Sequence, residues 1–128
     1  IQNFINGKLI QPNSSDYFDN QTPVTGKVYS QVPDSDKTDI DSAVSSAKEA
    51  FKTWSKLPKK ERYDHIMRLA DEVEAHFDEL VKAESKDNGK PEWLAKAVDI
   101  PRASENFRFF ATASLHFESE AAVQRTRR

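Results

Sequence analysis

Arg102 is the side chain in this sequence whose type and position best suit it to bind a ligand. It lies in IPRASENFRFFA (residues 100–111), directly after a proline and ahead of three phenylalanines. A proline kinks or restarts a helix, so the side chain that follows can be aimed into a neighbouring cleft. Phe107 and Phe110 have helical spacing and are interpreted as core residues, with Arg108 extending along its apolar stem to solvent.

Other side chains that carry chemistry are absent or poorly placed. The chain has no cysteine, which excludes disulfides, thiolate metal sites and a thiol nucleophile within it. His65 and His76 would lie about 16 Å apart on one helix, too far to share a metal ion. We expect these two and His116 at surface or cap positions, with no metal site. The Gly-Lys pairs in VTGK (24–27) and DNGK (87–90) lack the rest of a phosphate loop and favour turns.

Composition limits the class of protein. The chain has 128 residues, of which 37% are hydrophobic and 31% charged, and its formal net charge is −2. This predicts a single unit over residues 1–128 with a modest core, and it gives no electrostatic case for nucleic acid or anionic membrane. No apolar run approaches the roughly 18 residues of a membrane span, and no signal-peptide pattern is present. The lack of a signal peptide and of cysteine favours a cytoplasmic location.

Residues 1–34 are predicted to form β-hairpins. The Asn6-Gly7 pair readily adopts the positive φ angles of a type I′ turn between two short strands. Two further strands are expected at about residues 17–19 and 27–32, around a turn that contains proline and glycine. Hairpins this small are marginal alone, so they must lie against helices or another part of the protein.

Helical periodicity occupies residues 36–116. Thr38 and Asp41 resemble a capping box at the start of a first helix. A second, continuous helix is expected to end at Gly89, and a third begins just after it and is kinked or restarted at Pro101. The chain is therefore predicted to be an α+β fragment, mostly helical, with three amphipathic helices, N-terminal hairpin strands and a basic tail. The apolar faces include Phe51, Trp54, Phe77, Trp93 and Phe110.

Several segments resemble, in order, the N-terminal portion of the aldehyde dehydrogenase family. The resemblance runs from about Asn3 to Glu120. The DIPRASENFRFFA stretch is similar to the branch of the family that acts on 2-aminomuconic and 2-hydroxymuconic semialdehydes. The other matching segments are NFINGKLI (3–10), DNQTPVTGKVYSQVP (19–33), the helical run from DIDSAVSS to ADEVE (39–74) and LVKAESKDNGKP (80–91).

The resemblance implies a place in a larger enzyme. It assigns the helices to an α/β, Rossmann-like cofactor domain and places Arg102 and Val98 beside the substrate tunnel. An arginine there would pair with the carboxylate of an acidic semialdehyde. The implied partners are a small aldehyde, NAD or NADP as hydride acceptor in the full-length enzyme, and further copies of the same subunit.

The resemblance also implies that the catalytic groups lie elsewhere. The family's cysteine nucleophile, glutamate base and oxyanion-binding asparagine follow a P-W-N motif that this sequence does not reach. We therefore expect no catalytic or cofactor-binding residue here, and AVQRTRR (122–128) departs from the family pattern as altered reading, splicing or truncation would make it. Two functions remain open. One is the N-terminal segment of an NAD(P)⁺-dependent aldehyde dehydrogenase, inactive alone, and the other is a truncated module that self-associates or binds a full-length subunit.

Overall fold

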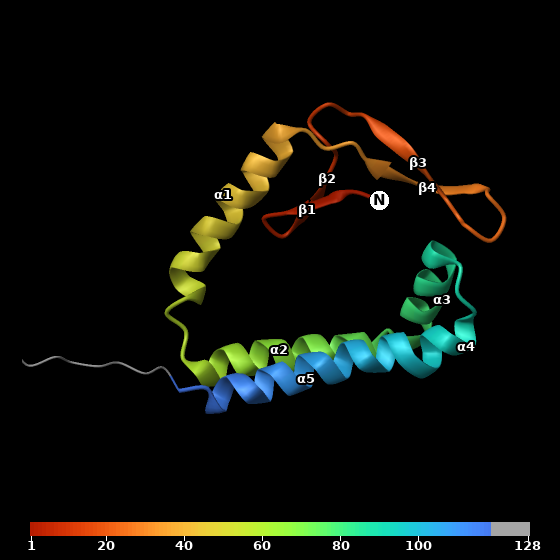
Figure 1. Ribbon diagram of the computed structural model, residues 1–128. Coiled ribbons are helices and arrows are strands. Elements are labelled where there is room, and N and C mark those ends of the chain that lie inside the picture. The colour runs from red at the N-terminus through yellow and green to blue at the C-terminus, as the bar shows by residue number, and fades with distance from the viewer. Residues whose placement is uncertain (119–128) are drawn as a thin grey trace, which may run out of the picture.

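A computed structural model describes residues 1–118 as two β-hairpins followed by a series of helices. The elements form an open ring, in which α2 and α5 lie side by side along one edge, α1 and α3 rise from it, and the hairpins lie opposite (Figure 1). The strands are β1 (Asn3–Ile5), β2 (Lys8–Ile10), β3 (Tyr17–Gln21) and β4 (Val28–Pro33). The helices are α1 (Lys37–Trp54), α2 (Lys59–Ala75), α3 (Phe77–Asn88), α4 (Glu92–Leu94), the π-helical turn η1 (Ala95–Asp99) and α5 (Ile100–His116).

The first hairpin confirms the turn expected at Asn6-Gly7. Strands β1 and β2 are antiparallel, and the two turn residues have φ angles of 52° and 74°. These positive values belong to the turn type whose twist matches that of the flanking strands. Strands β3 and β4 form a separate antiparallel pair, with an irregularity between Asn20 and Gln21. They lie where the sequence predicts them, and β3 is longer than expected.

The second hairpin is fastened to the end of α3 by polar contacts. The Tyr29 hydroxyl donates to Asp87 at 2.6 Å, and the Asn20 side-chain amide reaches the same carboxylate at 3.3 Å. The hydrogen bond between Tyr29 and Asp87 lowers the pKa of Asp87 and raises the pKa of Tyr29. The ammonium of Lys86 lies 4.4 Å from the centre of the Tyr29 ring, a cation–π distance.

Helix α1 begins two residues earlier than a Thr38–Asp41 capping box would place it, so that prediction is wrong. Asp36 is the N-cap, and its carboxylate accepts from the amides of Thr38 at 2.7 Å and Asp39 at 3.1 Å. The Asp39 carboxylate accepts in return from the Asp36 amide. The side-chain amide of Asn13, and then the Asp39 backbone, lower the pKa of Asp36. Aspartate therefore serves at both positions of this capping box. The Asp36 carboxylate reaches amides of the first turn, and the Asp39 carboxylate reaches back to the N-cap amide.

The single helix predicted up to Gly89 is two helices. The helical backbone is interrupted at His76, where φ is −104° and ψ is 22°. This residue is both the C-cap of α2 and the N-cap of α3. His65 and His76 therefore do not share one helix. The apolar stripe conceals the break, because Val73 before it and Phe77 after it pack against the same cluster. The glycine cap at the end of α3 is confirmed, with φ of 78° at Gly89.

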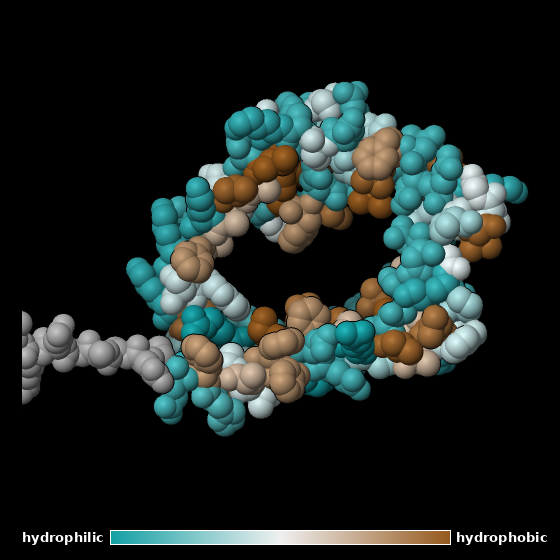
Figure 2. Space-filling view, in the orientation of Figure 1, coloured by the Kyte–Doolittle hydropathy of each residue, from teal (hydrophilic) through white to brown (hydrophobic). Residues whose placement is uncertain are grey.

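The buried apolar cluster comes from the helices. Val81, Ala95 and Ile100 are its buried members, and Val73, Phe77 and Leu80 pack around them. Several large aromatic side chains outside this cluster remain exposed. Phe51 and Phe110 are 63% and 65% exposed, and apolar side chains lie around the inner rim of the ring (Figure 2). Within residues 1–118, no helix has both the length and the apolar character needed to cross a bilayer.

Candidate substrate-binding segment

A π-helical turn interrupts the chain immediately before the candidate ligand residues. It covers Ala95–Asp99, and the Ile100 amide donates to the Ala95 carbonyl five residues earlier. Pro101 follows, and proline has no amide hydrogen and clashes with the carbonyl four residues before it. A wider turn at this point relieves that clash. The interruption predicted at Pro101 therefore takes the form of a π turn, after which α5 continues as a regular helix.

Lys90 ties this turn to the end of α3. Its ammonium lies 2.7 Å from Asp99 and 3.2 Å from Glu84, and the hydrogen bond to Asp99 is the main cause that raises the pKa of Lys90. The backbone of Lys90 is held as well. Its amide donates to the Asn88 side chain at 2.9 Å, and its carbonyl accepts from the Ser85 hydroxyl at 2.6 Å.

Val98 and Arg102, the residues predicted to contact substrate, lie on either side of the junction between the π turn and α5. Val98 belongs to the π turn and is 42% exposed. Arg102 lies in the first turn of α5 and is exposed. None of the ion pairs formed within residues 1–118 includes Arg102.

Arg108 has a different role from the one its sequence suggests. It is half-buried at the surface, where its guanidinium pairs with Asp71 at 2.7 Å and with Glu74 at 3.0 Å, both on α2. These hydrogen bonds, that to Asp71 first, raise the pKa of Arg108. These ion pairs join α5, the helix that carries Arg102, to α2.

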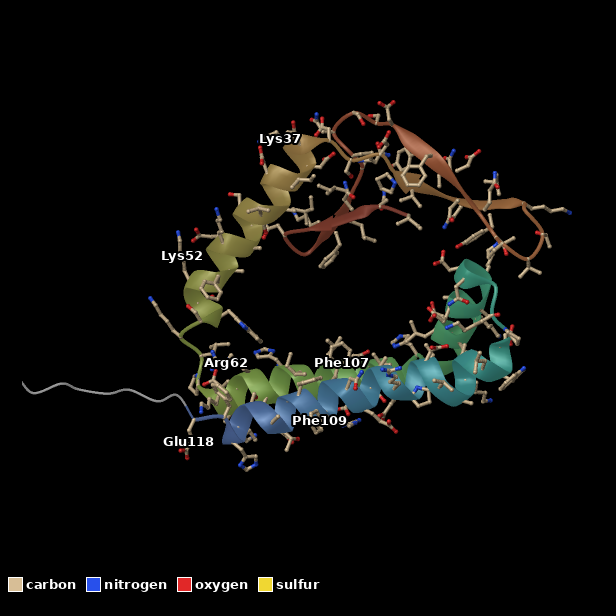
Figure 3. The ribbon with its side chains drawn as sticks, viewed as in Figure 1. Lys37, Lys52, Arg62, Phe107, Phe109 and Glu118 are labelled. Atoms are coloured by element: carbon tan, nitrogen blue, oxygen red, sulfur yellow. The ribbon has the colours of Figure 1, made fainter. Side chains whose placement is uncertain are left out.

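A groove of about 840 Å³ runs along the ends of α2 and α5 that lie nearest α1. Phe107 is half-buried on the wall of this groove, whereas the core position predicted for Phe110 is wrong, because that ring is mostly exposed. Phe107 lies on the side of α5 that faces the ring opening, and Phe109 lies on the outer side (Figure 3). The groove is lined mainly by apolar side chains and includes Trp54, Arg62, Ile66, Phe107, Phe110 and Phe117. Neither Val98 nor Arg102 lines it.

Comparison with known proteins decides the family. The model of the aldehyde dehydrogenase family matches residues 10–128, nearly the whole chain. The chain belongs to the aldehyde dehydrogenase family. The matched residues include 122–128, for which a departure from the family pattern was expected. These last residues lie outside the described part of the structure, so the tail prediction has no structural counterpart.

The relatives of this aldehyde dehydrogenase segment are much longer than it is. The 2-aminomuconic semialdehyde dehydrogenase of Mus musculus is 49% identical over 120 residues, covering 94% of this chain and 24% of the relative. A 2-hydroxymuconic semialdehyde dehydrogenase from a Pseudomonas species is 38% identical over 122 residues, covering 94% and 25%. The chain thus spans about a quarter of these relatives, and it is an N-terminal fragment of the family's fold.

Solved structures agree with that assignment. A putative aldehyde dehydrogenase from Burkholderia cenocepacia superposes with a TM-score of 0.92 at 32% identity, covering 98% of this chain and 26% of its own. The NAD⁺ complex of an aldehyde dehydrogenase from Bacillus cereus has a TM-score of 0.84 at 37% identity, covering 88% and 23%. The predicted family and the mostly helical fragment with N-terminal antiparallel strands are therefore confirmed.

Residues 1–118 do not themselves fit a dinucleotide. Nucleotide crevices of this type form at the carboxyl edge of a parallel sheet, with a glycine-rich loop leading into a helix. Here the strands form two antiparallel pairs, and Gly7, Gly26 and Gly89 each lie in a turn or helix cap with positive φ. No chemical step through the nicotinamide follows from these residues.

Proposed function

We propose that this chain is the N-terminal segment of an NAD(P)⁺-dependent aldehyde dehydrogenase that oxidises a semialdehyde bearing a carboxylate. Support comes from Arg102, an exposed guanidinium outside every ion pair formed within residues 1–118, carried on a helix that is fixed by its neighbours. The relatives named for 2-aminomuconic and 2-hydroxymuconic semialdehydes point to the same kind of substrate. In this proposal the complete enzyme is cytoplasmic and oligomeric.

The role of this segment is to bind and orient the substrate. Arg102 pairs with the substrate carboxylate through two parallel hydrogen bonds, the geometry for which a guanidinium is suited. Val98, one helical turn earlier, contacts the hydrocarbon part of the same molecule. The complete enzyme supplies NAD(P)⁺ as hydride acceptor and the nucleophilic cysteine from later residues. The isolated chain therefore has no dehydrogenase activity.

The test uses a fusion enzyme in which this chain replaces the matching segment of the mouse relative. We expect Arg102→Ala to raise KM for an acidic semialdehyde by about tenfold or more, the effect of losing a charge-assisted hydrogen bond. KM for a neutral aldehyde should change by less than about twofold, within the range of ordinary surface substitutions. Arg68→Ala, which removes an exposed arginine of α2, is the matched control. Equal losses on acidic and neutral substrates would contradict the proposed role.

The inactivity of the isolated chain has its own measurement. The purified 128-residue protein is incubated with NAD⁺ or NADP⁺ and an aldehyde, and absorbance of the reduced cofactor is followed. A rate above that of the buffer would refute the proposal that catalysis requires later residues.

The exposed apolar faces favour a second candidate function, a non-catalytic module that self-associates or binds a full-length subunit. Phe51, Trp93 and Phe110 are each more than 60% exposed, and apolar side chains lie around the inner rim of the ring (Figure 2). Contiguous exposed apolar surface marks association sites. Native mass spectrometry of source material separates the two. A species at a small multiple of 14.6 kDa favours the module, whereas a subunit several times heavier favours the enzyme segment. A reading frame that continues to P-W-N and a cysteine would favour the enzyme as well.

A further inference from the structure

Arg102 has an acidic neighbour at the end of the π turn that leads into its helix. Asp99 precedes it by three residues, and side chains at that spacing on a helix lie close enough to form an ion pair. Such a pair would occupy the guanidinium that the proposed function assigns to the substrate carboxylate. The pair is not formed: the Asp99 carboxylate is bound at 2.7 Å by Lys90 instead.

Lys90 is held in position to make this contact. Its backbone is fixed on both sides by Asn88 and Ser85, just past the glycine that caps α3. The Lys90 and Asp99 side chains are only 26% and 30% exposed, so solvent screens their attraction less than it screens a fully exposed pair. The second acceptor, Glu84, is also contacted by the Asn88 side-chain amide.

We propose that Lys90 is a specificity-determining positioning residue, which engages Asp99 and so keeps Arg102 available for an anionic substrate group. This inference rests on the proposed function of Arg102 as the carboxylate-binding residue. Lys90 acts through Asp99 and does not itself touch the substrate. In its absence Asp99 turns to Arg102, and the intramolecular carboxylate competes with that of the substrate.

The first test uses the 128-residue chain as it is. The ¹⁵N-resolved NMR signal of the Arg102 guanidinium Nε–H is assigned by its disappearance in Arg102→Lys. In Lys90→Met this hydrogen should exchange with water more slowly, because Arg102 now pairs with Asp99. Lys96→Met, which removes an exposed lysine of the π turn, is the matched control and leaves the exchange rate unchanged. An exchange rate in Lys90→Met equal to that of the control would overturn the proposal.

The second test measures selectivity in the fusion enzyme. Lys90→Met should raise KM for the acidic semialdehyde by about two- to fivefold, the strength of an exposed ion pair that now competes. KM for the neutral aldehyde and both kcat values should stay within about twofold. Adding Asp99→Asn to Lys90→Met removes the competitor, so the double variant should recover the original KM for the acidic substrate.

This recovery separates positioning from support of the fold. If Lys90 only held the π turn, Asp99→Asn could not restore what Lys90→Met had removed, and both substrates would suffer. A double variant as impaired as Lys90→Met overturns the inference and leaves the proposed function standing. If Arg102→Ala instead impairs acidic and neutral substrates alike, the proposed function fails, and the NMR measurement still decides whether Lys90 keeps Asp99 from Arg102.

Discussion

Gly89 lies where the end of α3 meets the turn between β3 and β4. Replacing it by alanine should lower the free energy of unfolding for two separate reasons. The residue caps α3 in the left-handed region, with φ of 78°. A Cβ atom added there would lie 2.8 Å from Cγ of Pro23, in the turn between β3 and β4. The proline ring is part of the backbone and cannot swing aside, so the whole turn must move away from α3.

Gly26 supplies the matched control, because it has the same backbone restriction without the contact. Its φ is 67°, and a Cβ added there meets nothing within 4 Å. The left-handed conformation alone costs alanine about 1 kcal/mol. Overpacking adds about 1–3 kcal/mol. We therefore expect Gly26→Ala to lower the free energy of unfolding by about 1 kcal/mol and Gly89→Ala by about 2–4 kcal/mol.

The assay is urea unfolding of the chain, followed by circular dichroism at a helix wavelength. Hydrogen exchange gives a second reading, because displacement of the turn in Gly89→Ala should speed exchange in β3 and β4 and leave the α2–α5 pair unchanged. Equal loss of stability in the two variants would refute the reasoning. It would mean that the close approach of Pro23 to Gly89 does not affect the free energy of unfolding.

Three further predictions concern polar contacts. Asp36→Ala removes the cap of α1 and should lower the melting temperature by about 4 °C at neutral pH. Hydrogen bonds from Asn13 and the backbone lower the pKa of Asp36 in the folded state. The stabilisation by its carboxylate is therefore complete above the ordinary pKa of 3.8 and is lost as pH falls through the lower folded pKa. Melting curves of the two proteins should accordingly converge in acid. Tyr29→Phe removes the hydroxyl that lowers the pKa of Asp87, so an NMR titration should find that pKa raised, and an unchanged value would contradict the assigned hydrogen bond. Arg108→Met should speed hydrogen exchange in α5 while sparing α1, and slow exchange along α5 in that variant would show that its ion pairs to α2 are dispensable.

Features specified by a few neighbouring residues could be predicted from the sequence. The Asn6-Gly7 turn and the glycine cap at Gly89 depend on local backbone preferences, and both are present. The break at His76 could not be predicted in this way, because the same apolar period runs through both helices and only their packing separates them. The capping box was misplaced because aspartate and threonine are both favoured at an N-cap, so either Asp36 or Thr38 could begin the helix.

The site was predicted less completely than the fold. Pro101 signalled an irregular helix but not its form as a π turn, which depends on how Ala95 and Ile100 pack. The Lys90–Asp99 pair was missed, since two charges nine residues apart across a cap and a turn show no recognisable spacing. Arg108 was taken for a solvent-facing side chain because its partners lie on another helix, far away in sequence.

The antiparallel pairing of α2 with α5 has a consequence for the order of events on the ribosome. The ion pairs of Arg108 with α2, and the bond from the Lys59 ammonium to the Phe117 carbonyl, join residues that have all been synthesised once position 117 has emerged. In a family-length protein, of which this segment is about a quarter, the helix pair can therefore form early in translation. At about 5–20 residues per second, the rest of the chain takes tens of seconds to follow. Throughout that interval no later residue is available to cover the apolar inner rim.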